Sequence, residues 1–163
     1  MIEMELVGVR VELPSNTPIV LLREVAGQRR VLPIFIGGPE ATAIAFALDG
    51  VVTPRPMTHD LMKDIIDELG TRLERIVVTD LAESTFYAEL HLQTPNGPRQ
   101  VSSRPSDALA LAVRIGAPIF AEEAVVDEAA TVIEEDADEP DSDEVVEQFR
   151  EVIDNVSPED FAS

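Results

Sequence analysis

The chain has 163 residues, 45% of them apolar and none of them cysteine. This composition suits one domain with some additional chain and excludes wholesale disorder, disulfide scaffolds, thiol catalysis and thiolate zinc sites. The formal net charge is −20, but residues 121–163 carry 17 acids and only one base, so the rest of the chain is close to neutral and shows no global basic footprint for nucleic acid.

The sequence contains no sign of a membrane segment or a secretion signal. No apolar run approaches the ~18–20 residues that a membrane helix needs. The first five residues, MIEME, are acidic where a signal peptide would be basic. We therefore expect a cytoplasmic protein that makes no membrane contact.

The first 36 residues predict three strands. Residues 5–13 alternate in side-chain character and end at the turn signal Pro14-Ser15-Asn16. Residues 18–25 and 31–36 follow, and the short loop between them favours a hairpin.

Two helices are predicted next. Gly37-Gly38-Pro39 ends the third strand and starts a helix over residues 39–48, which is apolar nearly all round and so should be buried. Thr58 is a good N-cap for a second helix over residues 59–69, and Gly70 is the expected stop.

The remaining pattern predicts further strands and one more buried helix, in this order: strands 72–81, 85–94 and 99–102, helix 105–115, and a short strand at 119–120. Runs of strands alternating with runs of helices are typical of the α+β class. We therefore predict a mixed, mainly antiparallel sheet with buried helices on one side, in a domain that spans residues 1–133.

The acidic end of the chain predicts a linker and a tail. Residues 122–133 could form a short helix, whereas residues 134–144 cannot bury apolar surface and should be disordered. In residues 145–163, apolar side chains recur at helical spacing and predict an amphipathic helix. That helix either docks on the parent domain or a neighbouring subunit, or recruits another protein. We also interpret the acidic segment as a competitor for the basic positions that nucleic acid would use.

An acid stands in the first turn of each predicted internal helix, namely Glu40, Asp60 and Asp107. One explanation is local, because an acid at a helix N-terminus interacts favourably with the helix dipole. The other is chemical: Arg55 and Arg104 each precede a proline and one of these helix starts, and arginine binds phosphate through two hydrogen bonds. Carboxylates that bind a divalent ion, together with arginines that bind phosphate, are the groups needed for metal-assisted phosphodiester cleavage.

Two other features allow alternative interpretations. Gly37-Gly38 could place backbone amides against an anion or could simply form the turn between strand and helix. Tyr87, the only tyrosine, could stack on a base or could pack within the sheet.

Four stretches resemble the signatures of the bifunctional nuclease domain family, in the family's order and spacing. They are residues 32–37 (LPIFIG) with Glu40-Ala41 and 43–45, residues 55–61 (RPMTHDL), Asp80-Leu81 with 85–88 (TFYA), and residues 104–108 (RPSDA) through Arg114 and 118–120. The likeness covers about residues 2–125, and residues 156–161 are similar to the tail of actinobacterial members. The resemblance implies an α+β domain that assembles at least as a dimer, with a nuclease activity on DNA and RNA.

The sequence therefore supports two functional hypotheses. The first is a nuclease that depends on a divalent metal, Mg²⁺ or Mn²⁺. Its proposed metal ligands are Glu40, Asp60, Asp80 and Asp107; its catalytic residues are His59, Asp60 and Asp107; its substrate-binding residues are Arg55, Arg104 and Tyr87. The alternative is a non-catalytic, oligomeric binding or regulatory module in which the same motifs serve packing and subunit contacts.

Overall fold

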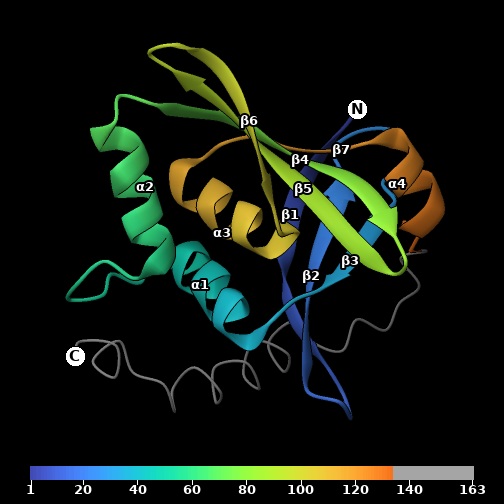
Figure 1. The fold of residues 1–163 in the computed structure, drawn as a ribbon. Coiled ribbons are helices and arrows are strands. Elements are labelled where there is room, and N and C mark those ends of the chain that lie inside the picture. Colours follow the sequence, from blue (N-terminus) through green and yellow to red (C-terminus); the bar gives the residue numbers. More distant parts are fainter. Residues whose placement is uncertain (134–163) are drawn as a thin grey trace.

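Strands and helices follow the predicted order in the computed structural model, which describes residues 1–133 (Figure 1). The elements are β1 (Ile2–Glu12), β2 (Thr17–Glu24), β3 (Val31–Phe35), α1 (Gly38–Leu48), α2 (Thr58–Glu68), β4 (Arg72–Ala82), β5 (Thr85–Thr94), β6 (Gly97–Ser103), α3 (Pro105–Ile115), β7 (Ile119–Ala121) and α4 (Glu123–Ala129).

The sheet consists of two antiparallel meanders joined through one short strand. Its strand order is β3-β2-β1-β7-β4-β5-β6. β7 pairs antiparallel with β1, where Met4 lies opposite Ile119, and parallel with β4, where Ile76 lies opposite the same residue. The β4–β7 pair is parallel and the other neighbouring strands are antiparallel. The predicted α+β class and the mixed, mainly antiparallel sheet are thus confirmed.

Small differences from the prediction occur at the ends of elements. β1 begins at Ile2 rather than at residue 5, and α4 ends at Ala129 rather than at residue 133. After α4, Thr131 forms an antiparallel bridge with Val31. The backbone N–H and carbonyl of Thr131 therefore bond to Val31 and not within a longer helix. The predicted linker 134–144 and the predicted helix in 145–163 lie outside the described residues.

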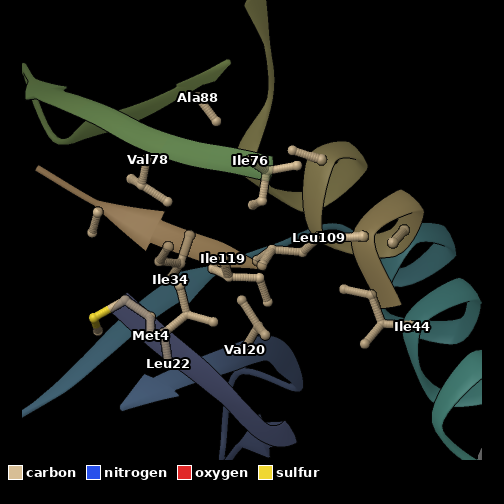
Figure 2. Packing of buried hydrophobic residues seen from close by; sticks show 14 of the residues in the cluster. Met4, Val20, Leu22, Ile34, Ile44, Ile76, Val78, Ala88, Leu109 and Ile119 are labelled. Atoms are coloured by element: carbon tan, nitrogen blue, oxygen red, sulfur yellow. The ribbon is translucent and has the colours of Figure 1, made fainter. Parts of the chain in front are cut away.

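α3 lies at the centre of the helical layer and packs against α1 and α2 as well as β4 and β5 (Figure 1). Its alanines are buried, as are Ala41, Ala43 and Ala45 of α1, and these small side chains allow neighbouring backbones to approach closely. Leu109 of α3 is fully buried and reaches toward Ile119 of β7 in the core shown in Figure 2. The core therefore fixes where α3 begins, which matters for the site described below.

α2 divides its apolar side chains between the core and solvent. Met62 and Ile66 pack against the core, whereas Leu61, Ile65 and Leu69 are about half exposed or more. Within residues 1–133, no helix is both long and apolar enough to cross a membrane.

Because α3 packs at the centre of the helical layer, a cavity on its buried face should strongly lower the stability of the protein. Leu109→Ala should lower the free energy of unfolding by about 2–5 kcal/mol, because a fully buried leucine loses its contacts and leaves a cavity. Leu61→Ala on the exposed side of α2 is the matched control and should change stability by about 0.5 kcal/mol or less. Urea denaturation of both variants measures the difference, and equal losses would contradict the assigned packing.

Candidate functional site

The first turns of α1, α2 and α3 meet in a cluster of four charged or polar side chains: Glu40, His59, Arg104 and Asp107. Arg104 is the N-cap residue of α3, and Pro105 follows it at the first helical position, where a missing N–H costs nothing. Glu40 and Asp107 lie in the first turns of α1 and α3. The sequence-predicted residues Glu40, His59, Arg104 and Asp107 are therefore brought together from three helices.

Asp107 accepts a hydrogen bond at each carboxylate oxygen. Arg104 Nε lies 2.8 Å from Oδ2, and His59 Nε2 lies 2.9 Å from Oδ1. Burial by itself would raise the pKa of Asp107, but the hydrogen bonds from Arg104 and His59 outweigh it, and the pKa lies below its ordinary value. The Asp107 carboxylate is therefore charged and oriented at neutral pH.

Arg104 links this carboxylate to a second one. Its Nη2 donates to Glu40 Oε1 at 3.0 Å, while its Nε is held by Asp107. The two carboxylates are largely shielded, with 14% of Glu40 and 25% of Asp107 exposed, whereas 65% of the Arg104 side chain is exposed. Because a guanidinium has five N–H donors, donors remain on Arg104 for an anion arriving from solvent.

Gly37 allows Glu40 to occupy this position. Gly37 is the N-cap of α1 with an extended backbone (φ −76°), and a Cβ added there would overlap the Glu40 carboxylate. A Cβ at the neighbouring Gly38 would meet nothing within 4 Å. The Gly37-Gly38 pair thus forms the turn between β3 and α1, and its first glycine also makes room for an acid of the cluster.

Asp60 has a different environment from its neighbour His59. Its Oδ1 accepts from Arg114 Nε at 2.7 Å, and its Oδ2 accepts from the backbone N–H of Met57 at 3.0 Å. Burial opposes ionisation, but these two hydrogen bonds hold the pKa of Asp60 below its ordinary value. Arg114 is only 8% exposed and also donates to the Ala110 carbonyl. Asp60 therefore caps α2, as the local explanation of the helix-start acids predicted, and also ties α2 to α3. Sequence reasoning missed the ion pair with Arg114, although that arginine stands in the last turn of α3.

Asp80 and Tyr87 lie on the sheet, where they are cross-strand neighbours on β4 and β5. Both are exposed, and Asp80 accepts a hydrogen bond from the backbone N–H of Leu81 at 2.8 Å. Within residues 1–133, neither forms a hydrogen bond or ion pair with the helix-start cluster. Arg55 lies in the loop between α1 and α2, where its carbonyl accepts a hydrogen bond from the Thr53 hydroxyl at 2.6 Å.

The structure does not gather the four predicted metal ligands. In the described part of the chain, no three His, Asp or Glu side chains are grouped so that they could hold a metal ion. The guanidinium of Arg104 lies between Glu40 and Asp107, in the place that a shared cation would take. The donor arrangement therefore does not fit a preformed Mg²⁺ or Mn²⁺ site, and metal binding remains a prediction.

A pocket opens beside the cluster. It has a volume of about 350 Å³ and is lined by residues 34–37 at the end of β3, residues 84–86 at the β4–β5 turn, and residues 104–106 at the start of α3. Arg104 thus belongs both to the cluster and to the pocket wall. Sequence reasoning missed the pocket, because its three segments are distant in the chain.

Comparisons with known proteins connect the sequence of this chain to a family. Residues 20–134 match the family described as "Bifunctional nuclease domain". An uncharacterized protein of Mycobacterium tuberculosis is 48% identical over 163 residues, covering 98% of this chain and 97% of its own. "Bifunctional nuclease 2" of Arabidopsis thaliana is 30% identical over 112 residues, and "Bifunctional nuclease 1" of the same plant is 28% identical over 105. The aligned segments span 34% and 32% of these two plant proteins.

The environment of Asp107 predicts a pH-dependent contribution to stability. Its pKa is lower in the folded protein than the ordinary 3.8, so its stabilising effect is fully present above that pH and is lost as the pH falls through the folded-state pKa. Asp107→Asn has no carboxyl group to titrate. The gap in unfolding free energy between the parent and Asp107→Asn should therefore be constant above about pH 5 and shrink in more acidic solution. Urea unfolding at a series of pH values measures this gap, and a gap that grows in acid would contradict the assignment.

Proposed function

Because this chain belongs to the bifunctional nuclease domain family, we propose that it hydrolyses phosphodiester bonds in nucleic acid at the helix-start cluster. The observation that carries the proposal is the exposed Arg104 guanidinium, bonded to an oriented carboxylate and lining a pocket. An exposed guanidinium binds phosphate oxygens, and a neighbouring carboxylate can position water against the phosphorus.

Arg104 and Asp107 divide the chemistry between them. Arg104 binds the phosphate and compensates the negative charge that builds up in the transition state. Asp107 orients a water molecule and accepts its proton as the water oxygen bonds to phosphorus. The bond from phosphorus to the leaving sugar oxygen breaks, and that oxygen takes a proton from solvent.

His59 and Glu40 act through these two residues. His59 is 7% exposed and contacts Asp107 Oδ1, so in this geometry it fixes the carboxylate rather than touching the substrate. Glu40 holds one terminal nitrogen of Arg104 and so limits the directions the guanidinium can take. Both are therefore positioning residues in the proposed reaction.

A divalent cation remains part of the nuclease hypothesis as a separate proposal. Mg²⁺ or Mn²⁺ prefers carboxylate oxygens, and Glu40 and Asp107 supply them on either side of Arg104. Such an ion would have to displace the guanidinium, so the steps above rely only on this chain's own side chains. Assays with added Mg²⁺, with Mn²⁺ and with a chelator compare the two possibilities.

The binding-module alternative has its own supporting observation. Leu61 and Ile65 of α2 and its C-cap residue Leu69 are spaced by four residues and remain exposed, as a contact between subunits would require. The alternative predicts no cleavage, whereas a nuclease that assembles into oligomers would show both properties. Light scattering together with the cleavage assay distinguishes these cases.

The first functional prediction concerns the cluster itself. Asp107→Asn and Arg104→Met should each lower kcat/KM for cleavage of labelled DNA and RNA oligonucleotides by about 10²-fold or more, because each removes a group that acts on the phosphate. Asp80→Asn, which changes an exposed acid on the sheet, is the matched control and should stay within about twofold. Circular dichroism checks that the variants are folded. Cleavage by Asp107→Asn at the parental rate would refute the assignment.

The second functional prediction uses the paired glycines. Gly37→Ala should displace the Glu40 carboxylate from Arg104 and lower kcat/KM by about tenfold, whereas Gly38→Ala should have little effect. In a Glu40→Ala background the clash is absent, so Gly37→Ala should cause no further loss. This double-mutant cycle isolates the effect that passes through Glu40. Additive losses would show that Gly37 acts by another route.

A further inference from the structure

We propose that the pocket beside Arg104 binds one unpaired base of the substrate, so that the enzyme acts on single-stranded nucleic acid. This inference rests on the proposed nuclease function and adds the substrate class. It depends on three properties of the pocket: an exposed aromatic ring, a single charged group, and a size that suits one nucleotide.

Phe35 supplies the exposed aromatic ring. It is the last residue of β3, lines the pocket and is 59% exposed, so its ring is open to a ligand from solvent. Phe86 lines the pocket from the β4–β5 side and packs against the core at the same time. Aromatic side chains of this kind provide stacking surfaces for nucleobases, whichever base is present.

The charge of the pocket lining indicates which kind of aromatic ligand the pocket favours. The lining contains one charged side chain, Arg104, and no carboxylate, although the chain as a whole is strongly acidic. The Ser84, Thr85 and Ser106 side chains add hydroxyl groups that can donate or accept hydrogen bonds. A planar apolar ring joined to a phosphate satisfies both the aromatic wall and the guanidinium, and a nucleotide unit has this composition.

The size and shape of the pocket indicate that the base must be unpaired. A volume of about 350 Å³ lies at the small end of the range for small-molecule sites, which suits a single nucleotide and excludes a duplex. In a duplex the faces of a base are covered by its stacked neighbours, so a side chain can stack on that base only after it leaves the helix. A single strand meets this requirement without the cost of unpairing.

Binding measurements test the inference without relying on cleavage. The full-length protein is titrated into a fluorescein-labelled, non-hydrolysable phosphorothioate oligonucleotide, either as a single strand or as a duplex, and anisotropy gives the affinity. The parent should bind the single strand at least about tenfold more tightly. Phe35→Ala should weaken that binding about 5- to 100-fold, whereas Phe35→Trp, which retains the stacking surface, should bind at least as tightly as the parent.

Val52→Ala is the matched control, because Val52 is 89% exposed and lies in the loop after α1, outside the pocket lining. It should leave both affinities unchanged. Equal affinity for the two forms, or unchanged binding by Phe35→Ala, would overturn the inference.

The same variants separate failure of this inference from failure of the proposed function. If the parent cleaves duplexes as fast as single strands and Phe35→Ala cleaves normally, the pocket assignment is wrong while the nuclease stands. If single strands bind through Phe35 but the parent cleaves neither form, the nuclease proposal is overturned and the pocket remains a binding site for unpaired bases.

Discussion

Two carboxylates lie close to each other where α1 and α3 begin, and the Arg104 guanidinium between them offsets their repulsion. Glu40 and Asp107 are both largely shielded from water, so each would be costly to keep charged without a partner. Arg104 supplies hydrogen bonds to both, and its remaining surface faces solvent. The interaction that holds the two carboxylates together therefore also places a guanidinium in the wall of the pocket.

The helices reach this arrangement because two consecutive residues of α2 bind opposite ends of α3. His59 contacts Asp107 in the first turn of α3, and Asp60 contacts Arg114 in its last turn. Arg114 is nearly buried, and Asp60 also caps its own helix. α2 is thereby fixed along α3 by polar contacts as well as by the packing of Met62 and Ile66.

The sheet contributes by bringing distant segments to the same place. β7 joins the two meanders and follows the end of α3, while β6 leads into its start. α3 packs over β4 and β5 between these two connections. The end of β3 and the β4–β5 turn then supply the other walls of the pocket. A site at such a junction can differ between relatives in its loops while the core stays constant.

The pattern of side chains determined the secondary structure of the described residues and the fold class. Alternation along β1 and β5, the turn at Gly37-Gly38 and the stop at Gly70 depend on local preferences, which act within a few residues. Candidate site residues were also recognisable, because the motifs that contain them resemble those of a known family: Glu40, Arg55, His59, Asp60, Asp80, Tyr87, Arg104 and Asp107. Such reasoning identifies candidate residues but does not say which of them are in contact.

Only the tertiary structure decided which partner each charged residue has. His59 and Asp60 are adjacent in the chain but have different partners. His59 contacts Asp107, whereas Asp60 accepts a hydrogen bond from Arg114. Asp80 lies on the sheet opposite Tyr87, because the register of β4 and β5 pairs these two residues. Glu40 and Asp107 both form ion pairs with Arg104. The packing of α1 against α3 brings the two carboxylates within reach of the same guanidinium. Long-range packing of the helices on the sheet fixes these distances, and no local pattern of residues encodes them.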